Sequence, residues 1–361
     1  MTAPSSILDL DDTGALIDAD VDGILRFAAL GGAQIRATAA AVDEQILDRL
    51  HGLHPRSVVL VCGDARAARA GELVVAMLAA RSAVPLVTAP VTPPWVGPLD
   101  VVVVAGDDAG DPQLVESVAA ALRRGAEVVV DAPDEGPIRA AAAGRAMLLP
   151  PRIRVPVAYS LLRHLAVFLA VVAAMEATRT AGAVPPLADL ADSADGEAGR
   201  DQPGSEVFRN PAKALAARIQ SRRVALAGDS AVTAALARHA GESLLQVAGV
   251  IAAAAALPDV LAARDRLVAI PPAGGESYDP FFHDEQLDGP VPAPPARVFV
   301  VSVEEDRRQA ERRAAALPDM ELVSVVGEFE AKAVPSVPEQ VAVLAVRFEM
   351  AAAYLRLVGG R

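Results

Sequence analysis

Short runs of consecutive apolar residues alternate with longer segments of helical pattern in the first half of this chain. The runs lie at 58–61, 85–88, 101–104 and 127–130, and Gly, Asp or Pro residues follow each one closely. Strands that are apolar at successive positions are typical of a parallel sheet covered by helices on both faces. The pattern therefore predicts an α/β unit between about 57 and 178.

The same strand–turn–helix pattern occurs a second time. Residues 58–65 read VVLVCGDA and residues 224–231 read VALAGDSA, each an apolar strand, a Gly-Asp turn and the start of a helix. A further strand and helix follow each copy, at 100–124 and at 297–317. Two α/β units related by a pseudo-two-fold axis are therefore predicted. Ligands of such folds bind at the carboxyl ends of the strands, so the loops there form the candidate site.

Composition divides the rest of the chain. A helical pattern over 16–40 predicts a helical arm, whereas 185–209 is rich in Pro, Gly, Asp and Ser without a period and predicts a linker, mobile over 192–204. The segments 159–175 and 339–357 are apolar on most faces, so both helices are predicted to be buried. The predicted division is an N-terminal helical arm at 1–45, a first unit at 46–181, a linker at 182–209 and a second unit at 210–361.

Charge and composition argue against several classes of function. A net charge of -13 disfavours a nucleic-acid partner, because phosphate backbones are bound by clustered Lys and Arg. The apolar stretch 165–175 is too short to span a bilayer, and the first residues lack a signal-peptide pattern, so we expect a cytoplasmic protein with no membrane partner. The lone cysteine, Cys62, is expected in the core. No glycine-rich dinucleotide loop or P-loop occurs, so no cofactor is expected.

Residues 210–216 carry the most specific motif. Their sequence, Asn-Pro-Ala-Lys-Ala-Leu-Ala, predicts a helix capped by Asn210 with Pro211 at its first position. This stretch, shortly before a strand, resembles the bacterial and archaeal bifunctional phosphoglucose/phosphomannose isomerases, which are tandem sugar-isomerase (SIS) domain proteins. The segments 20–25 and 335–360 resemble that family's amino-terminal arm and closing helix, and they occur in the same order along the chain.

The resemblance extends to a subgroup and has structural implications. The segments 279–284 and 288–290 are similar to the actinobacterial proteins often labelled TobH. The family implies an α/β fold of two flavodoxin-like SIS units, each a parallel sheet with helices on both faces. It also implies a homodimer with the active site near the dimer contact, and a sugar phosphate or sugar derivative as the ligand.

The loop that holds phosphate in SIS domains is changed here. In that family a loop like Ser-Tyr-Ser-Gly-Asn-Thr donates hydroxyl and backbone N–H groups, whereas the equivalent residues 105–111 read AGDDAGD. Ionised carboxylates only accept hydrogen bonds, and two like charges ~4 Å apart at an effective dielectric of ~20 repel by roughly 4 kcal/mol. Asp111 is instead expected to cap a helix. With the acidic segment 131–135 at the same edge, the loop predicts a cationic, metal-bridged or weakly charged partner.

The catalytic groups of the isomerases are also missing or displaced. The place of the family's base, a glutamate that moves a proton between C1 and C2, falls on Leu245, and no histidine lies at 252–259, where the family's ring-opening histidine is expected. His239 and Glu242, three residues apart, remain as weak candidates and form either an acid–base pair or a surface pair on one helix. Residues 283–285 (His-Asp-Glu) are expected to be a polar loop and not a metal site.

Three hypotheses follow. The first is a non-catalytic relative of the isomerases that binds a carbohydrate derivative or has a regulatory role. The second is an active aldose–ketose isomerase of hexose 6-phosphates that uses repositioned groups such as His239, Glu242 and Arg154. The third is a structural dimer that scaffolds another protein. The candidate binding residues are Gly63, Asp64, Arg66, Gly106, Asp107, Arg152, Arg154, Gly228, Asp229 and Ser230.

Overall fold

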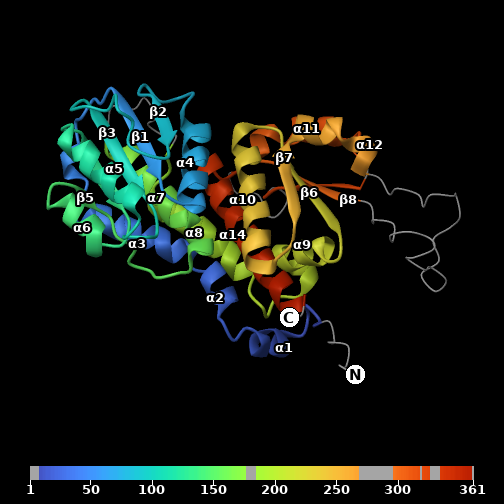
Figure 1. Ribbon diagram of the computed structural model, residues 1–361. Coiled ribbons are helices and arrows are strands. Elements are labelled where there is room, and N and C mark those ends of the chain that lie inside the picture. The colour runs from blue at the N-terminus through green and yellow to red at the C-terminus, as the bar shows by residue number, and fades with distance from the viewer. Residues whose placement is uncertain (1–7, 176–183, 268–295, 318, 326–333, 360–361) are drawn as a thin grey trace, which may run out of the picture.

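A computed structural model describes residues 8–175, 184–267, 296–317, 319–325 and 334–359 of the chain (Figure 1). The N-terminal arm consists of α1 (Thr13–Ala19), α2 (Ile24–Ala28) and α3 (Gly31–Asp43). The single helical segment predicted over 16–40 is therefore interrupted. Gly23 has φ +67°, and the Asp20 carboxylate accepts hydrogen bonds from the N–H groups of Ile24 (2.7 Å) and Leu25 (3.1 Å), which starts a new helix.

The first unit is a five-stranded parallel sheet in the order β2-β1-β3-β4-β5. Its strands are β1 (Ser57–Cys62), β2 (Leu86–Ala89), β3 (Asp100–Ala105), β4 (Glu127–Asp131) and β5 (Met147–Leu148). The four predicted strands are confirmed, and only the two-residue β5 was not expected. Val58 and Leu60 of β1 enter one core and Val59 and Val61 enter another, so the sheet is buried on both faces.

Helices cover both faces of this sheet. One face packs on α4 (Ala65–Leu78) and α7 (Leu161–Ala174), and the other on α5 (Pro112–Arg123) and α6 (Gly136–Ala142). The helix predicted over 159–175 is confirmed as α7 and is almost wholly buried. Short 3-10 helices lie at Asp48–Leu50, Val157–Tyr159, Val207–Arg209 and Glu304–Asp306.

The second unit repeats the arrangement with four parallel strands in the order β7-β6-β8-β9. They are β6 (Arg223–Gly228), β7 (Ala252–Ala256), β8 (Ala296–Val301) and β9 (Met320–Val323). The helices are α9 (Pro211–Ile219), α10 (Ala231–Ala248), α11 (Leu257–Ala262), α12 (Arg264–Leu267) and α13 (Arg307–Ala314). Strand β7 consists of five alanines, which have little preference for strands, and it was not predicted.

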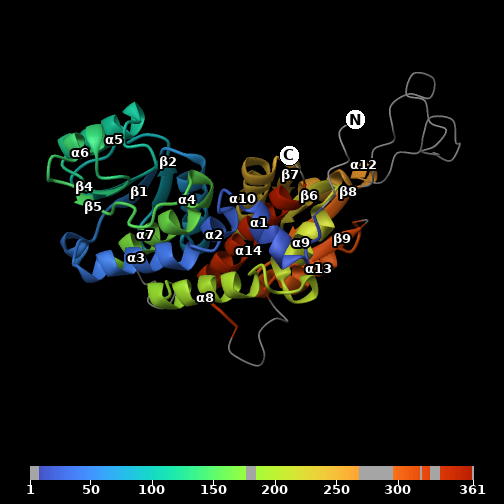
Figure 2. The same ribbon diagram turned by 90° about the horizontal axis from the view of Figure 1, so that it is seen from below.

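The predicted linker is wrong in one respect, because it contains the helix α8 (Leu187–Arg200). Its buried residues, among them Leu190 and Ala194, pack on α3 and on the closing helix α14 (Val337–Val358). The carboxylate of Glu197, fully buried, accepts a hydrogen bond from Arg347 Nε of α14 at 2.6 Å. Figure 1 and Figure 2 show α10 and α14 between the two sheets, with α8 along one side. Among the described helices, none combines the length and apolar character needed to cross a bilayer.

Candidate functional site

A cleft of about 470 Å³ lies at the carboxyl ends of β3, β4 and β5, where parallel α/β sheets bind ligands. We call it the first-unit cleft. Two predicted residues, Asp107 and Arg154, line it together with Arg163 from α7. The remaining lining residues are Pro133, Asp134, Glu135, Pro150, Pro151, Ile153, Val155 and Val157.

The loops after β1 and β3 are held together by Asp64. Its carboxylate caps α4 by accepting hydrogen bonds from Arg66 N (2.8 Å) and Ala67 N (2.9 Å), and it also accepts one from Asp107 N (3.1 Å). Gly63 and Gly106 both pack against Leu114, because an added Cβ would approach the Leu114 side chain to 2.7 and 2.5 Å, respectively. These predicted residues are therefore brought together, with Asp64 and the two glycines shaping the loops.

Arg163 changes the electrostatics expected of this edge. Its guanidinium, almost fully buried, donates to the carboxylates of both Asp107 and Asp131. Ser160 Oγ donates to Asp107 Oδ2 at 2.7 Å. His164 Nδ1 lies 2.6 Å from Asp131 Oδ2, and its Nε2 lies 3.6 Å from Asp107 Oδ2. The sequence analysis placed Arg163 and His164 only within the apolar helix predicted over 159–175, so it missed the groups that pair with Asp107 and Asp131.

The pKa values in this network move in opposite directions. Burial by itself raises the pKa of Asp107, but the neighbouring His164 and the charge of Arg163 outweigh it and lower the pKa to about 2. Burial and Arg163 lower the pKa of His164, but the carboxylates of Asp131 and Asp107 outweigh them and raise it. His164 thus lies between two carboxylates that favour its protonated form. The sequence predicted that the carboxylates at this edge repel phosphate. For Asp107 that prediction is wrong, because its negative charge is paired with Arg163.

The other acidic residues of the 105–111 loop accept hydrogen bonds from backbone N–H groups. Asp111 caps α5, as predicted, by accepting a hydrogen bond from Gln113 N at 2.8 Å, and Asp108 accepts one from Gly110 N at 2.7 Å. Ligand atoms of Asp64, Asp107 and His164 lie within 4.8 Å of one another. Because Arg163 already supplies the positive charge at Asp107, we assign no metal to this cluster. Residues 283–285 lie outside the described residues.

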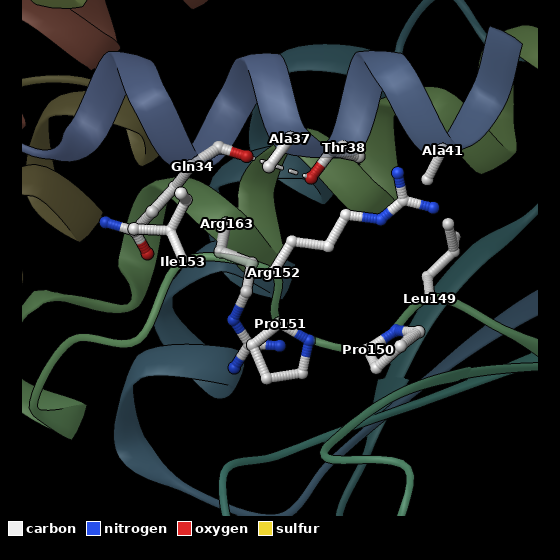
Figure 3. A pocket seen from close by; sticks show the side chains of 10 residues that line it. All are labelled: Gln34, Ala37, Thr38, Ala41, Leu149, Pro150, Pro151, Arg152, Ile153 and Arg163. Atoms are coloured by element: carbon white, nitrogen blue, oxygen red, sulfur yellow. Dashed lines mark hydrogen bonds between the residues drawn. The ribbon is translucent and has the colours of Figure 1, made fainter.

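Arg152 is placed beside the first-unit cleft and not in it. Figure 3 shows its side chain extending along α3 toward Ala41, while the Arg163 guanidinium points away from α3. The Arg152 guanidinium forms a bidentate pair with the Glu44 carboxylate at 2.6 and 2.5 Å on the surface. An exposed pair of this kind contributes little to stability.

The predicted residues of the second unit support local structure. Ser230 caps α10 in a capping box with Thr233. The Asp229 carboxylate is buried and paired with Arg313 of α13. Gly228 lies directly against the backbone of Thr233 and Ala234, so a Cβ there has no room. These residues are not part of the first-unit cleft.

Arg66, His239 and Glu242 meet between the two units, in a group that we call the interface cluster. The guanidinium of Arg66, fully buried, lies 2.9 Å from His239 Nδ1, and Glu242 Oε1 accepts a hydrogen bond from Arg69 at 2.6 Å. Burial, with Arg66 and Arg69, holds the pKa of His239 well below its usual value. Neither the acid–base interpretation nor the surface interpretation of His239 anticipated this environment, since the residue is fully buried and does not line the first-unit cleft.

Solved structures share this architecture at low sequence identity. The C-terminal domain of glucosamine-fructose-6-phosphate aminotransferase from Francisella tularensis matches with a TM-score of 0.63 and 9% identity, over 93% of this chain and 96% of that one. Tagatose-6-phosphate ketose/aldose isomerase from Escherichia coli matches with a TM-score of 0.58 and 14% identity, over 97% and 94%. Glucosamine-6-phosphate deaminase from Thermotoga maritima matches with a TM-score of 0.58 and 8% identity, over 93% and 95%.

No family model and no curated protein matches the chain. The structural likeness establishes the fold, two flavodoxin-like units as in SIS-domain and phosphosugar isomerase structures. The names of these neighbours describe an aminotransferase, an isomerase and a deaminase. Because one fold can carry several reactions, the function has to be argued from the residues of the site.

Proposed function

We propose that this protein is a non-catalytic relative of the bifunctional phosphoglucose/phosphomannose isomerases, of the TobH-like subgroup. In this proposal it binds a sugar phosphate or another anionic sugar derivative in the first-unit cleft. The observation that carries the proposal is the state of Asp107 and His164. A base that removes a proton from carbon works best with a pKa near the operating pH, whereas the pKa of Asp107 is about 2. His164 is fully buried, and its two ring nitrogens face the carboxylates of Asp131 and Asp107, so neither nitrogen is directed at the cleft.

Arg154 supports the binding part of the proposal. It is exposed, lines the first-unit cleft and makes no ion pair with a described residue. A guanidinium presents several donors to a phosphate or carboxylate in a planar arrangement. Arg163 lies in the same lining and offsets the charge of Asp107. Arg154 is therefore the group that we expect to take over the role of the missing loop hydroxyls.

Two measurements test the proposal. Calorimetric titration with glucose 6-phosphate and mannose 6-phosphate at neutral pH is expected to show binding that weakens about tenfold in Arg154→Ala, since hydrogen bonds to charged groups contribute ~1.5–3 kcal/mol. Arg145→Ala, an exposed arginine of the same unit outside the cleft lining, is the matched control. A coupled assay with fructose 6-phosphate at high protein concentration is expected to show no turnover. Absence of binding, or equal weakening in both variants, would contradict the binding part.

An active aldose–ketose isomerase is the second candidate. One observation favours it, namely that Glu135, an exposed carboxylate, lines the same cleft. Turnover of fructose 6-phosphate that is abolished by Glu135→Gln would replace the first proposal with this one. Loss of turnover in Glu242→Gln would also replace the first proposal with the isomerase. In that case the interface cluster would have to move to reach the substrate, because Glu242 does not line the first-unit cleft. The homodimer implied by the family resemblance is part of both candidates and is measured by light scattering of the full chain.

A further inference from the structure

Charged groups of both signs line the first-unit cleft. Three carboxylates belong to the lining, those of Asp107, Asp134 and Glu135, together with the guanidinium groups of Arg154 and Arg163. The rest of the wall consists of prolines and β-branched residues. An apolar wall with a few charged groups is the usual composition of a small-molecule site, so the charges decide which ligand fits.

Two of the three carboxylates have partners within the protein. Asp107 accepts hydrogen bonds from the guanidinium of Arg163 and from Ser160 Oγ, the latter at 2.7 Å. Asp134 accepts a hydrogen bond from Arg139 Nε at 2.8 Å. Because an arginine offsets each of these charges, neither carboxylate needs a cationic group from a ligand.

Glu135 differs from the other two carboxylates, because no group in the described part of the chain donates a hydrogen bond to it. It lies at the N-cap of α6, a position that favours Ser, Thr, Asp or Asn, and its side chain makes no capping hydrogen bond. Arg139 is near enough to attract the charge of Glu135, but its hydrogen bonds go to Asp134. The Glu135 carboxylate therefore has no role in local structure and is available to a ligand.

Arg154 is the counterpart of opposite sign. It is exposed, and no carboxylate within the described ranges forms an ion pair with it. Once the internal pairs are set aside, the cleft offers one positive and one negative group, on the segments 150–157 and 133–135. A ligand whose only charge is a phosphate pairs with Arg154 but is repelled by Glu135. A ligand that also carries a protonated amino group pairs with both.

We propose that the first-unit cleft is selective for amino sugar phosphates, with the phosphate at Arg154 and the ammonium group at Glu135. This inference rests on the proposed function and specifies the class of sugar derivative. An ammonium group has three donors and no acceptor, which suits a carboxylate that lacks a donor. Hydrogen bonds between charged partners are also stronger than neutral ones. The hydroxyl group of an ordinary hexose phosphate makes a neutral hydrogen bond and leaves the charge of Glu135 uncompensated.

Calorimetric titration of the full chain with glucosamine 6-phosphate, N-acetylglucosamine 6-phosphate and glucose 6-phosphate tests the selectivity. All three probes carry the same phosphate, and the first alone has a charged amine at pH about 6.5, below the usual pKa of an amino group. We expect glucosamine 6-phosphate to bind about tenfold more tightly than either of the others, from one added hydrogen bond between charged groups. EDTA in every titration excludes a divalent cation that bridges Glu135 and the phosphate.

Glu135→Gln isolates the effect of the carboxylate, because glutamine has nearly the same size and no charge. This variant is expected to bind glucosamine 6-phosphate and glucose 6-phosphate with equal affinity. Glu116→Gln is the matched control, since Glu116 is an exposed glutamate of the first unit outside the cleft lining, and it is expected to keep the preference of the parent. The Glu135 side chain makes no capping bond, so its variant is expected to fold, which a thermal melt verifies.

The outcomes separate this inference from the proposed function. Equal binding of the three probes by the parent chain would overturn the selectivity and leave sugar phosphate binding in place. A preference for glucosamine 6-phosphate that Glu135→Gln retains would do the same. Binding of glucosamine 6-phosphate that Arg154→Ala leaves unchanged would overturn the placement of the phosphate. Failure of all three probes to bind at millimolar concentration would overturn the proposed function as well.

Discussion

At the scale of single residues, burial changes the pKa values of His239, which belongs to the interface cluster, and of Glu349, which lies beside it. Burial lowers the pKa of His239 well below its usual value, and Arg66 and Arg69 add to the effect. Burial raises the pKa of Glu349 to about 8, although the charge of Arg66 opposes it. His239 Nε2 and Glu349 Oε1 lie 3.3 Å apart. We therefore expect a neutral imidazole next to a protonated carboxyl at neutral pH.

This pair predicts how stability depends on pH. Folded Glu349 keeps its proton up to pH about 8, whereas an unfolded glutamate loses it near 4.5. The contribution of Glu349 to the free energy of unfolding is therefore lost as the pH rises toward 8. Below about 6.5 His239 acts in the opposite sense, because the unfolded histidine takes up a proton that the folded one does not. Between pH 6.5 and 8, Glu349 therefore lowers the free energy of unfolding with no opposing effect from His239. The slope expected from this one group is ~1.4 kcal/mol per pH unit.

Glu349→Gln keeps a hydrogen-bonding side chain of similar size but cannot ionise. Urea unfolding at four pH values between 6.5 and 8 is expected to show a steeper fall of the free energy in the parent chain than in the variant. The raised pKa of His164 lowers stability over this range in both proteins, so only the difference between the two slopes reports Glu349. Equal slopes in the two proteins would show that Glu349 is already ionised when folded.

At the scale of elements, α8 and α3 approach each other closely. A Cβ at Gly32 of α3 would lie 2.8 Å from the carbonyl oxygen of Ala191 and would also overlap the Asp195 side chain. Arg36 of α3 pairs with Asp192 and Asp195 of α8 on the exposed side. Helix α8 thus packs on a helix that lies far away in the chain. The small residues Gly32 of α3 and Ala191 of α8 make the close contact possible.

Gly32→Ala and Gly196→Ala test this contact. Both glycines lie within helices, but an added Cβ at Gly196 meets nothing within 4 Å. We expect Gly32→Ala to destabilise the protein by ~1–3 kcal/mol through overpacking and Gly196→Ala to stabilise it by ~0.4–1 kcal/mol. Thermal melts of the two variants measure the difference. The packing of α3 on α8 would be looser than described if both variants gained stability.

At the scale of the whole molecule, one hydrophobic core joins the two units. It includes Val58 and Leu60 of β1, Leu226 of β6, Phe168 of α7 and Phe348 of α14. Helices α4 and α10 contact each other across the boundary, where the interface cluster lies. The division at residue 181 stays a prediction about sequence organisation, but we do not expect it to mark an independent folding unit.

A fragment of residues 1–181 tests this expectation. Without α10 and α14 the fragment exposes the apolar surfaces of α4 and α7, so we expect it to aggregate or to lack fixed tertiary structure in near-ultraviolet circular dichroism. Co-expression with residues 182–361 is the control and is expected to restore a folded complex. A fragment that unfolds cooperatively by itself would show that the two units are separable.

The candidate site could be predicted only in part, for reasons that differ between residues. Asp107 was predicted because loops at the carboxyl ends of strands meet at one edge of the sheet, whereas Arg154 was predicted as a repositioned group from the resemblance to the isomerases. Arg163 was missed because nothing local shows that a buried arginine in an apolar helix will face two carboxylates. Arg66 was a candidate binding residue, but its buried side chain lies against His239 in the interface cluster and does not line the first-unit cleft.

The hydrophobic pattern by itself determined the four main strands of the first sheet, the duplication of the unit and the buried character of α7 and α14, because these depend on short-range periodicity. Tertiary structure decided the rest. It selected β7 from a run of alanines by pairing it with β6, folded α8 against α3 and α14, and set the charge of the first-unit cleft through Arg163. Each of these outcomes depends on a contact between residues distant in the chain, and such contacts leave no periodic signal in the local sequence.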